Sequence, residues 1–220
     1  MNNQSNNKPF LTNVSELRAR ARQKIEEGAI TNSYALDPEK ACGVLNQALA
    51  TELVCVLRYR FHYFMASGIH SGAVAKEFLI HSNEELGHAD LLAERIKQLG
   101  GKPEMNPDVL SKLSHSEYQE GGTLSEMLKE DLIAERIAIE SYRELITYFG
   151  DEDPTTRRML EGILAVEEEH ADELADFLFA QGETGEAPRR LYAKDEATVQ
   201  AVAPSSTNAK KPAAASKTSA

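Results

Sequence analysis

The chain has 220 residues, of which 41% are hydrophobic and 27% charged, and its formal net charge is −11. This apolar share excludes wholesale disorder, and the length favours one or two domains. The sequence contains no run of about 18 apolar residues, so it predicts no membrane-spanning helix. The polar start MNNQSNNKPF offers no apolar core for a secretory signal. We therefore expect a cytoplasmic protein without a membrane partner, whose acidic body repels nucleic-acid phosphates and suits metal cations better.

The acidic excess lies in the middle of the chain. Residues 1–37 carry five basic and four acidic side chains, and residues 183–220 carry six basic and four acidic ones. From Pro204 onward there is no acidic and no large apolar residue, so this segment cannot bury enough surface to offset its ordering entropy. We expect a folded domain over 38–182 between an N-terminal extension and a flexible tail that is disordered from about residue 204.

Proline and glycine divide the chain into helical segments. Proline is absent from the interiors of 39–102, 108–153 and 155–187. Such stretches permit long helices, because proline inside a helix removes a hydrogen bond and clashes with the preceding turn. Apolar residues recur at helical spacing within them, without strand-like alternation. The predicted helices are 14–27, 38–67, 71–99, 123–149 and 153–181.

Helix-start signals agree with these boundaries. The expected capping residues and first-turn prolines are Asp37-Pro38, Ser71, Thr123 with Glu126, and Asp153-Pro154. Short turns join the first pair and the last pair of long helices, whereas residues 100–122 form a long link between the pairs. This pattern predicts an all-α fold, a ferritin-like four-helix bundle with one long crossover, preceded by a short N-terminal helix.

One motif occurs on two of the long helices. The second carries Glu85-x-x-His88 and the fourth carries Glu167-x-x-His170. At a spacing of i, i+3 the two side chains project from one helix face, about 60° apart around the axis. Glu84 competes with Glu85 for this role, but only the i−3 position holds Glu in both copies. The shared pattern therefore selects Glu85 and Glu167.

A matching carboxylate precedes each motif. Glu52 lies 33 residues before Glu85, and Glu135 lies 32 residues before Glu167. Both stand among apolar neighbours on the other two long helices, where an unpaired carboxylate is costly and needs compensation. Four Glu and two His that converge in a helical core suit a pair of Fe or Mn ions. The alternative interpretation is a set of solvated helix charges.

Four segments resemble bacterioferritin and its relatives in the ferritin-like superfamily, namely LNQALATELVCVLRY, NEELGHADLLAERI, KEDLIAERIAIESYREL and AVEEEHADEL. The resemblance covers residues 38–182. It implies a ferroxidase, in which a pair of Fe(II) ions per subunit is oxidised by O₂ or H₂O₂. The Fe(III) would then move into a mineral core inside a hollow homo-oligomer, which stores iron and protects against oxidative stress. The preferred oxidant, and the choice of Fe or Mn, stay open.

The resemblance also implies roles for single residues. Tyr59, seven residues after Glu52, matches a family tyrosine that hydrogen-bonds next to the metal ligands. The implied ligands are Glu52 and Glu135 as terminal carboxylates, Glu85 and Glu167 as bridges, and His88 and His170 as terminal imidazoles.

Departures from the family narrow this expectation. Leu86 stands where bacterioferritin has its haem-binding methionine, so we expect no haem. The sequence from Gly182, GETGEAPRR, breaks rather than starts the fifth helix of 24-subunit ferritins. These features favour the Dps-like mini-ferritins, which form 12-subunit shells. No C-x-x-C pair follows the bundle, so the rubredoxin module of a rubrerythrin is missing.

Other residues receive lesser roles. Asp131, one turn before a candidate ligand, is expected either to orient a ligand imidazole or to be an exposed acid. His62 and His81 are expected to contact a partner or to be satisfied at the surface, rather than to bind metal. Cys42 and Cys55 are 13 residues apart on one predicted helix, about 20 Å along its axis, which excludes a mutual disulfide. We expect both to be small buried side chains.

Two other functions stay open. A dimanganese catalase-like enzyme uses a similar set of Glu and Glu-x-x-His ligands on a bundle, although this chain is short for that family. A DNA-protecting mini-ferritin would hold phosphate weakly through Lys210, Lys211 and Lys217, whose number a multisubunit shell multiplies. The subunit number and the contacts of the N-terminal helix are not fixed by the sequence.

Overall fold

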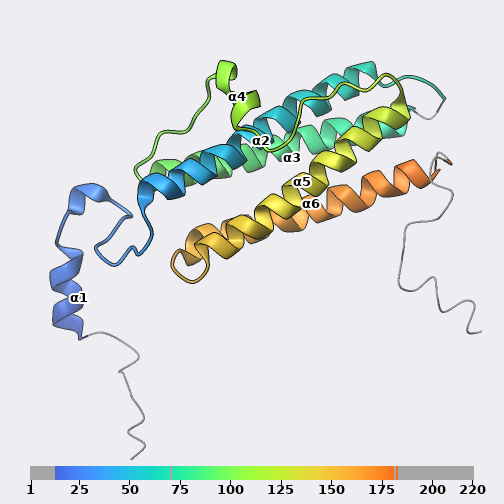
Figure 1. Ribbon diagram of the computed structural model, residues 1–220. Helices are drawn as coiled ribbons and strands as arrows, with labels where there is room; N and C mark the ends of the chain where they lie inside the picture. The colour runs from blue at the N-terminus through green and yellow to red at the C-terminus, as the bar shows by residue number, and fades with distance from the viewer. Residues whose placement is uncertain (1–12, 70, 181, 183–220) are drawn as a thin grey trace, which may run out of the picture. The chain divides into compact units, whose positions relative to one another are not determined.

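The computed structural model describes residues 13–69, 71–180 and 182. Every regular element in this part of the chain is helical (Figure 1). The elements are α1 (Val14–Ala21), the 3₁₀ turn η1 (Ile25–Glu27), α2 (Pro38–Met65), α3 (Ser71–Gln98), α4 (Pro107–Leu113), α5 (Leu124–Phe149) and α6 (Pro154–Ala180). The tail predicted from residue 183, with its three lysines beyond Pro204, lies outside the described residues.

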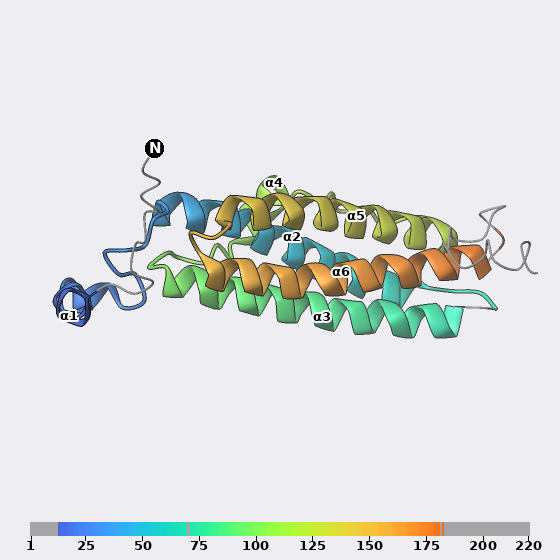
Figure 2. The same ribbon diagram turned by 90° about the horizontal axis from the view of Figure 1, so that it is seen from below.

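The four long helices form two antiparallel pairs, α2 with α3 and α5 with α6 (Figures 1 and 2). Contacts within each pair are the most extensive ones between helices, and contacts of α2 with α5 and of α3 with α6 join the pairs. The short helix α4 belongs to the long link between α3 and α5 and packs on α2. The predicted all-α bundle with one long crossover is confirmed.

Side-chain caps set the start of three long helices. Asp37 Oδ1 accepts a hydrogen bond from a backbone N–H in the first turn of α2 at 3.0 Å. Thr123 Oγ1 does the same for α5 at 3.2 Å, and Asp153 Oδ1 for α6 at 2.9 Å. The prediction that Ser71 caps α3 is wrong. Ser71 is the first residue inside that helix, and its hydroxyl donates back to the carbonyl of Gly68 at 2.9 Å.

Two short elements differ from the prediction. The helix expected over 14–27 ends at Ala21, and the chain reverses at Lys24, whose φ of 49° is left-handed. The helix α4 in the crossover was not predicted, although Asn106-Pro107 repeats the cap-and-proline signal of the long helices. That signal alone does not distinguish a helix of two turns from a turn, because the apolar stripe is too short to be periodic.

Two apolar clusters fill the core, and a polar segment of each long helix lies between them. One cluster includes Leu45, Leu49, Leu92, Phe149 and Leu160. The other includes Phe78, Leu128, Leu174 and Leu178. On every long helix the candidate ligands fall between the residues of the two clusters in sequence. The bundle therefore holds its polar groups at mid-height with apolar packing above and below.

The helix α2 is the one described helix whose length and composition would suit a membrane span, with a mean hydropathy of 1.3 over its most apolar window. The sequence analysis predicted no such segment. In the structure, 56% of that window is buried inside the protein, and the same helix carries the buried charged side chains Glu52 and Arg58. The position of α2 in the core explains its apolar length.

Candidate metal centre

The six predicted ligands lie together at mid-height of the bundle. The helix α2 contributes Glu52, and α5 contributes Glu135. The Glu-x-x-His pairs lie on α3 and α6, where the i, i+3 spacing turns both side chains of each pair towards the bundle axis. All six are buried, and the most exposed of them, His88, shows only 6% of its surface. The alternative of solvated helix charges is therefore excluded.

The ligand atoms form two overlapping groups. In one group, His88 Nδ1 lies 2.9 Å from Glu167 Oε1, 3.1 Å from Glu85 Oε2 and 3.5 Å from Glu52 Oε2. The ligand atoms of these four residues all lie within 4.8 Å of one another. Such spacing is that of donors around a single cation.

The second group contains His170 and Glu135 together with the same two carboxylates. His170 Nδ1 lies 3.3 Å from Glu85 Oε1, 3.8 Å from Glu135 Oε2 and 4.0 Å from Glu167 Oε2. Glu85 and Glu167 thus belong to both groups, one oxygen of each facing each imidazole. This sharing is the arrangement that two cations bridged by two carboxylates require.

Several buried polar atoms of this cluster have no hydrogen-bond partner. They are Glu85 Oε1, Glu167 Oε1 and His170 Nδ1. Buried polar atoms in native proteins are nearly always paired, because an unpaired one costs about 1–3 kcal/mol. Three orphaned donors and acceptors in one cluster indicate that a cation belongs there. The oxygen-rich set with two imidazoles fits Fe or Mn.

The four carboxyl groups do not carry equal charge in the metal-free protein. Burial raises the pKa of Glu52 to about 8, and the nearby Glu85 carboxylate adds to this effect. Burial and the neighbouring carboxylates also raise the pKa of Glu167 well above its usual value. Burial acts the same way on Glu135, but the nearby His170 imidazole and the hydrogen bond from Tyr59 outweigh it and lower that pKa to about 2. Like charges this close cannot all ionise together.

The two imidazoles hold protons more strongly than free histidine. Burial alone would lower the pKa of His88, but hydrogen bonds to Glu52 and Glu85 outweigh it and raise the pKa to about 9. The same opposition raises the pKa of His170 to about 11, with Glu135 and Glu85 as the partners. Protons therefore compensate the carboxylates in the metal-free protein, and a binding metal must displace them.

Comparison with known proteins identifies the fold family. The sequence profile of the ferritin-like domain matches residues 42–180. The chain belongs to the ferritin-like family. It is 34% identical over 142 residues to a nutrient stress-induced DNA-binding protein of Synechococcus, across 62% of this chain and 80% of that protein. It is 33% identical over 134 residues to a bacterioferritin of Rhodobacter capsulatus, across 60% of this chain and 79% of the relative.

Solved structures of ferritin-like proteins agree. The dodecameric thioferritin of Bacteroides fragilis, a bacterioferritin-related protein, has a TM-score of 0.65 and 31% identity, across 70% of this chain and 94% of its own. Dps from Thermosynechococcus elongatus has a TM-score of 0.62 at 21% identity, across 64% and 90% of the two chains. This second likeness is one of fold alone.

Two tyrosines fix the terminal carboxylates of this ferritin-like bundle across helix pairs. Tyr59 on α2 donates its hydroxyl proton to Glu135 on α5, and Tyr142 on α5 donates to Glu52 on α2. The sequence analysis singled out Tyr59 but missed Tyr142. The signal was present, because each tyrosine follows the Glu of its own helix by seven residues. Each helix pair of the ferritin-like bundle thus supplies a tyrosine that holds a glutamate of the other pair.

The predictions for Asp131 are wrong. Asp131 is fully buried, so it is not an exposed acid, and it orients neither ligand imidazole. Its Oδ1 accepts from Arg58 Nε at 2.8 Å, and its Oδ2 lies 2.8 Å from His62 Nδ1. The group that orients a ligand imidazole is Glu84, whose Oε2 lies 2.9 Å from Nε2 of His170. From the sequence, Glu84 is predicted only as a competitor of Glu85 for the ligand role.

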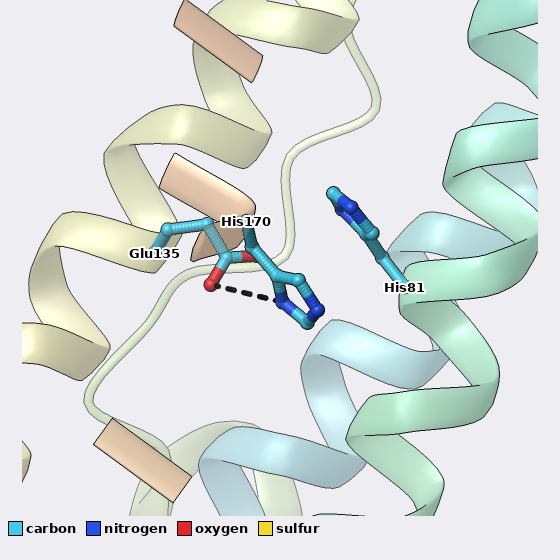
Figure 3. Close-up of side chains that lie close together, drawn as sticks. All are labelled: His81, Glu135 and His170. Atoms are coloured by element: carbon cyan, nitrogen blue, oxygen red, sulfur yellow. Dashed lines mark ion pairs between the residues drawn. The ribbon is translucent and has the colours of Figure 1, made fainter. Parts of the chain in front are cut away.

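The structure also changes the view of the two extra histidines. His62 and His81 are both fully buried in this chain rather than satisfied at its surface. The ring of His81 stacks on that of His170 with 3.9 Å between the centroids. Figure 3 shows His81, from α3, beside His170 and Glu135. Helical spacing offered a signal for this contact, because His81 lies one turn before Glu85 and therefore on the same face of α3.

Proposed function

We propose that this ferritin-like protein is a ferroxidase whose substrate Fe(II) binds as a pair between Glu52, Glu85, His88, Glu135, Glu167 and His170. The observation that carries the proposal is the pair of buried four-residue groups that share Glu85 and Glu167. Four carboxylates and two imidazoles neutralise the charge of two divalent ions once the carboxylates are ionised. Oxygen-rich ligands also favour Fe(III) over Fe(II), which promotes oxidation by O₂ or H₂O₂.

The surrounding side chains give the site its geometry. Tyr59 and Tyr142 hold the terminal carboxylates from opposite helix pairs, and Glu84 holds His170 through the nitrogen that faces away from the cluster. A ligand imidazole whose other nitrogen is hydrogen-bonded has a fixed tautomer and ring orientation. The terminal groups are therefore positioned before iron arrives, which limits the reorganisation needed on binding.

We further propose that the subunits assemble into a hollow, cytoplasmic homo-oligomer that stores the oxidised iron and limits oxidative stress. The related thioferritin is dodecameric, and this supports a 12-subunit shell over one of 24 subunits. A shell separates Fe(III) from the solvent, so that oxidation at the centre feeds a mineral rather than a precipitate.

Aerobic addition of Fe(II) to metal-free protein tests this function. Wild-type protein should oxidise Fe(II) faster than buffer with O₂ or H₂O₂, and the iron should stay with the assembled protein in size-exclusion chromatography. Glu167→Gln should oxidise it at the buffer rate, because a shared ligand is lost. Glu169→Gln, on an exposed neighbour in α6, is the matched control and should behave as wild type. Equal rates for the two variants would contradict the proposal. Rapid O₂ release from H₂O₂ by Mn-loaded protein would instead support the dimanganese catalase.

DNA protection is a second candidate function, favoured by the names of two relatives. One is the nutrient stress-induced DNA-binding protein of Synechococcus, and another is the DNA protection during starvation protein of Pyrococcus furiosus, at 30% identity. The lysines proposed to hold phosphate, Lys210, Lys211 and Lys217, lie outside the described residues. Retardation of duplex DNA that is lost on deleting residues 204–220 would support this role, and unchanged or absent retardation would contradict it.

A further inference from the structure

A second group of metal-ligating side chains adjoins the proposed dimetal centre. His81 on α3 is flanked by Glu77, one turn earlier on the same helix, and by Glu173, one turn beyond His170 on α6. His81 Nε2 lies 2.9 Å from Glu173 Oε2 and 3.7 Å from Glu77 Oε1. The ligand atoms of the three residues all lie within 4.8 Å of one another. The row of candidate ligands is thus extended by two turns on α3 and by one turn on α6.

Hydrogen bonding on the opposite side of His81 leaves Nε2 in need of a cation. Tyr59 has a single hydroxyl proton, which it donates to Glu135. The Tyr59 oxygen, 3.3 Å from Nδ1 of His81, therefore accepts a hydrogen bond from this nitrogen. In a neutral imidazole the other nitrogen then carries a lone pair, and here it points at two carboxylates. Lone pair and carboxylates repel one another unless a positive charge lies between them.

A metal ion can bind all three ligand atoms at once, whereas a proton cannot. A proton on Nε2 makes one good hydrogen bond, to Glu173, and leaves Glu77 at 3.7 Å. Burial and the adjacent Glu173 carboxylate raise the pKa of Glu77. The imidazole is fully buried, whereas the side chains of Glu77 and Glu173 are 24% and 42% exposed. A cation can therefore reach the nitrogen from solvent along the carboxylates.

We propose that Glu77, His81 and Glu173 form a third divalent-cation site beside the dimetal centre, with Nε2 of His81 and one oxygen from each carboxylate as ligands. The His81 ring stacks on the ring of His170, so this cation and the dimetal centre would be bound by adjacent imidazole rings. Its use as a waiting position for substrate Fe(II) rests on the proposed function, whereas binding of the cation does not.

Titration of the metal-free, full-length assembly with Co(II), followed by native mass spectrometry and visible absorption, tests the site. Co(II) is stable in air and accepts the same ligands. Wild type should bind about three Co(II) per chain, and the double variant Glu77→Gln/Glu173→Gln about two. Glu94→Gln/Glu169→Gln, which removes two exposed acids from the same helices, is the control and should bind as wild type. Retention of the remaining Co(II) shows that the double variant is folded.

The possible outcomes separate the two proposals. Equal stoichiometry in wild type and in Glu77→Gln/Glu173→Gln would overturn the third site and indicate that His81 carries only a proton. Wild-type binding that Glu167→Gln leaves unchanged would instead contradict the dimetal centre. If the third site also feeds the centre, the double variant should oxidise Fe(II) with a raised KM and an unchanged kcat. A fall in kcat at unchanged KM would contradict that role.

Discussion

Two buried polar clusters lie in the same bundle, and they differ in whether protein groups alone supply partners for all their charged atoms. In the crossover clamp, defined here as Arg58, His62 and Asp131, both carboxylate oxygens have partners at 2.8 Å. Arg58 also donates to the carbonyl of Glu117 at 2.9 Å, and His62 Nε2 lies 2.8 Å from that of Glu120. No atom of the clamp is among the unpartnered buried side-chain atoms found in the described residues, whereas the dimetal centre contributes three.

This difference separates a structural cluster from a binding one. The clamp ties α2 and α5 to the crossover, and removing Asp131 leaves the buried guanidinium of Arg58 without a compensating carboxylate. The proposed dimetal centre contains more acids than its imidazoles can neutralise, and burial with like charges raises the pKa of Glu52 and Glu167. Burial and charge are common to both clusters, so neither property identifies a functional site by itself. Unpaired atoms gathered in one cluster are what distinguishes the proposed centre, since the other two such atoms in the described residues, Ser125 Oγ and Arg157 Nε, are isolated.

The largest expected effect is on the clamp. Asp131→Ala leaves the buried Arg58 without its carboxylate and should lower the free energy of unfolding of the metal-free protein by about 3–5 kcal/mol. Glu168→Ala is the control, because it removes an acid whose partner, Arg143, is exposed, and it should cost less than about 1 kcal/mol. Urea denaturation measures both. Similar costs would show that the clamp is not structural.

Replacing a ligand of the proposed dimetal centre should change the metal-free stability little and the stabilisation by metal strongly. In Glu52→Gln the metal-free protein should keep its stability within about 1 kcal/mol, because the raised pKa of Glu52 leaves that carboxyl largely protonated at neutral pH. The stabilisation that wild type gains from saturating Co(II), about 3 kcal/mol per site at a hundredfold excess over Kd, should fall, because one of the cation positions loses a ligand. Thermal unfolding with and without Co(II) measures this. A variant as strongly stabilised by Co(II) as wild type would remove Glu52 from the ligands.

The long helices and the six converging residues are predictable from the sequence, whereas the contacts of the clamp are not, for a physical reason. Proline, glycine and capping residues marked the ends of the long helices to within a few residues, and the repeated Glu-x-x-His motif selected the six residues that converge. Helical periodicity assigns a residue to a face but does not say which atom of a neighbouring helix it meets. Asp131 was therefore given the wrong partner, since its contact with Arg58 depends on the relative rise of α2 and α5.

A smaller effect should follow from the support of His170. Glu84→Gln keeps a side chain of the same shape but removes the charge beside Nε2. The loss of such a partner typically lowers metal affinity by about 10–100-fold. Isothermal titration with Co(II) measures the affinity, and Glu169→Gln on α6 is the charge-matched control. Unchanged affinity in Glu84→Gln would show that the imidazole is fixed by its stacking on His81 alone.

The last expected effect is a pH dependence of the free energy of unfolding that arises from the proposed dimetal centre. His88 has a folded pKa of about 9 against an unfolded 6.5, so its stabilisation is complete below pH 6.5 and lost as pH rises through 9. Glu52, raised from 4.5 to about 8, also favours the folded state less as pH rises over that interval. The metal-free protein should therefore lose more than about 1 kcal/mol between pH 6 and 9, and metal binding should tighten.

Glu52→Gln should remove part of this pH dependence, because the amide does not titrate. Unfolding at a series of pH values, with and without Co(II), measures both trends. Stability of the metal-free protein that rises with pH over this range would contradict the assignment of protons to the cluster.

Anomalous diffraction at the iron edge, from crystals loaded with Fe(II) without oxygen, tests the central claim most directly. Two adjacent iron peaks are expected in the proposed dimetal centre, apart from any iron held by Glu77, His81 and Glu173. Both should be contacted by Glu85 and Glu167, one being completed by Glu52 and His88 and the other by Glu135 and His170. Iron found only elsewhere, with His88 Nδ1 still 2.9 Å from Glu167 Oε1, would contradict the proposed centre.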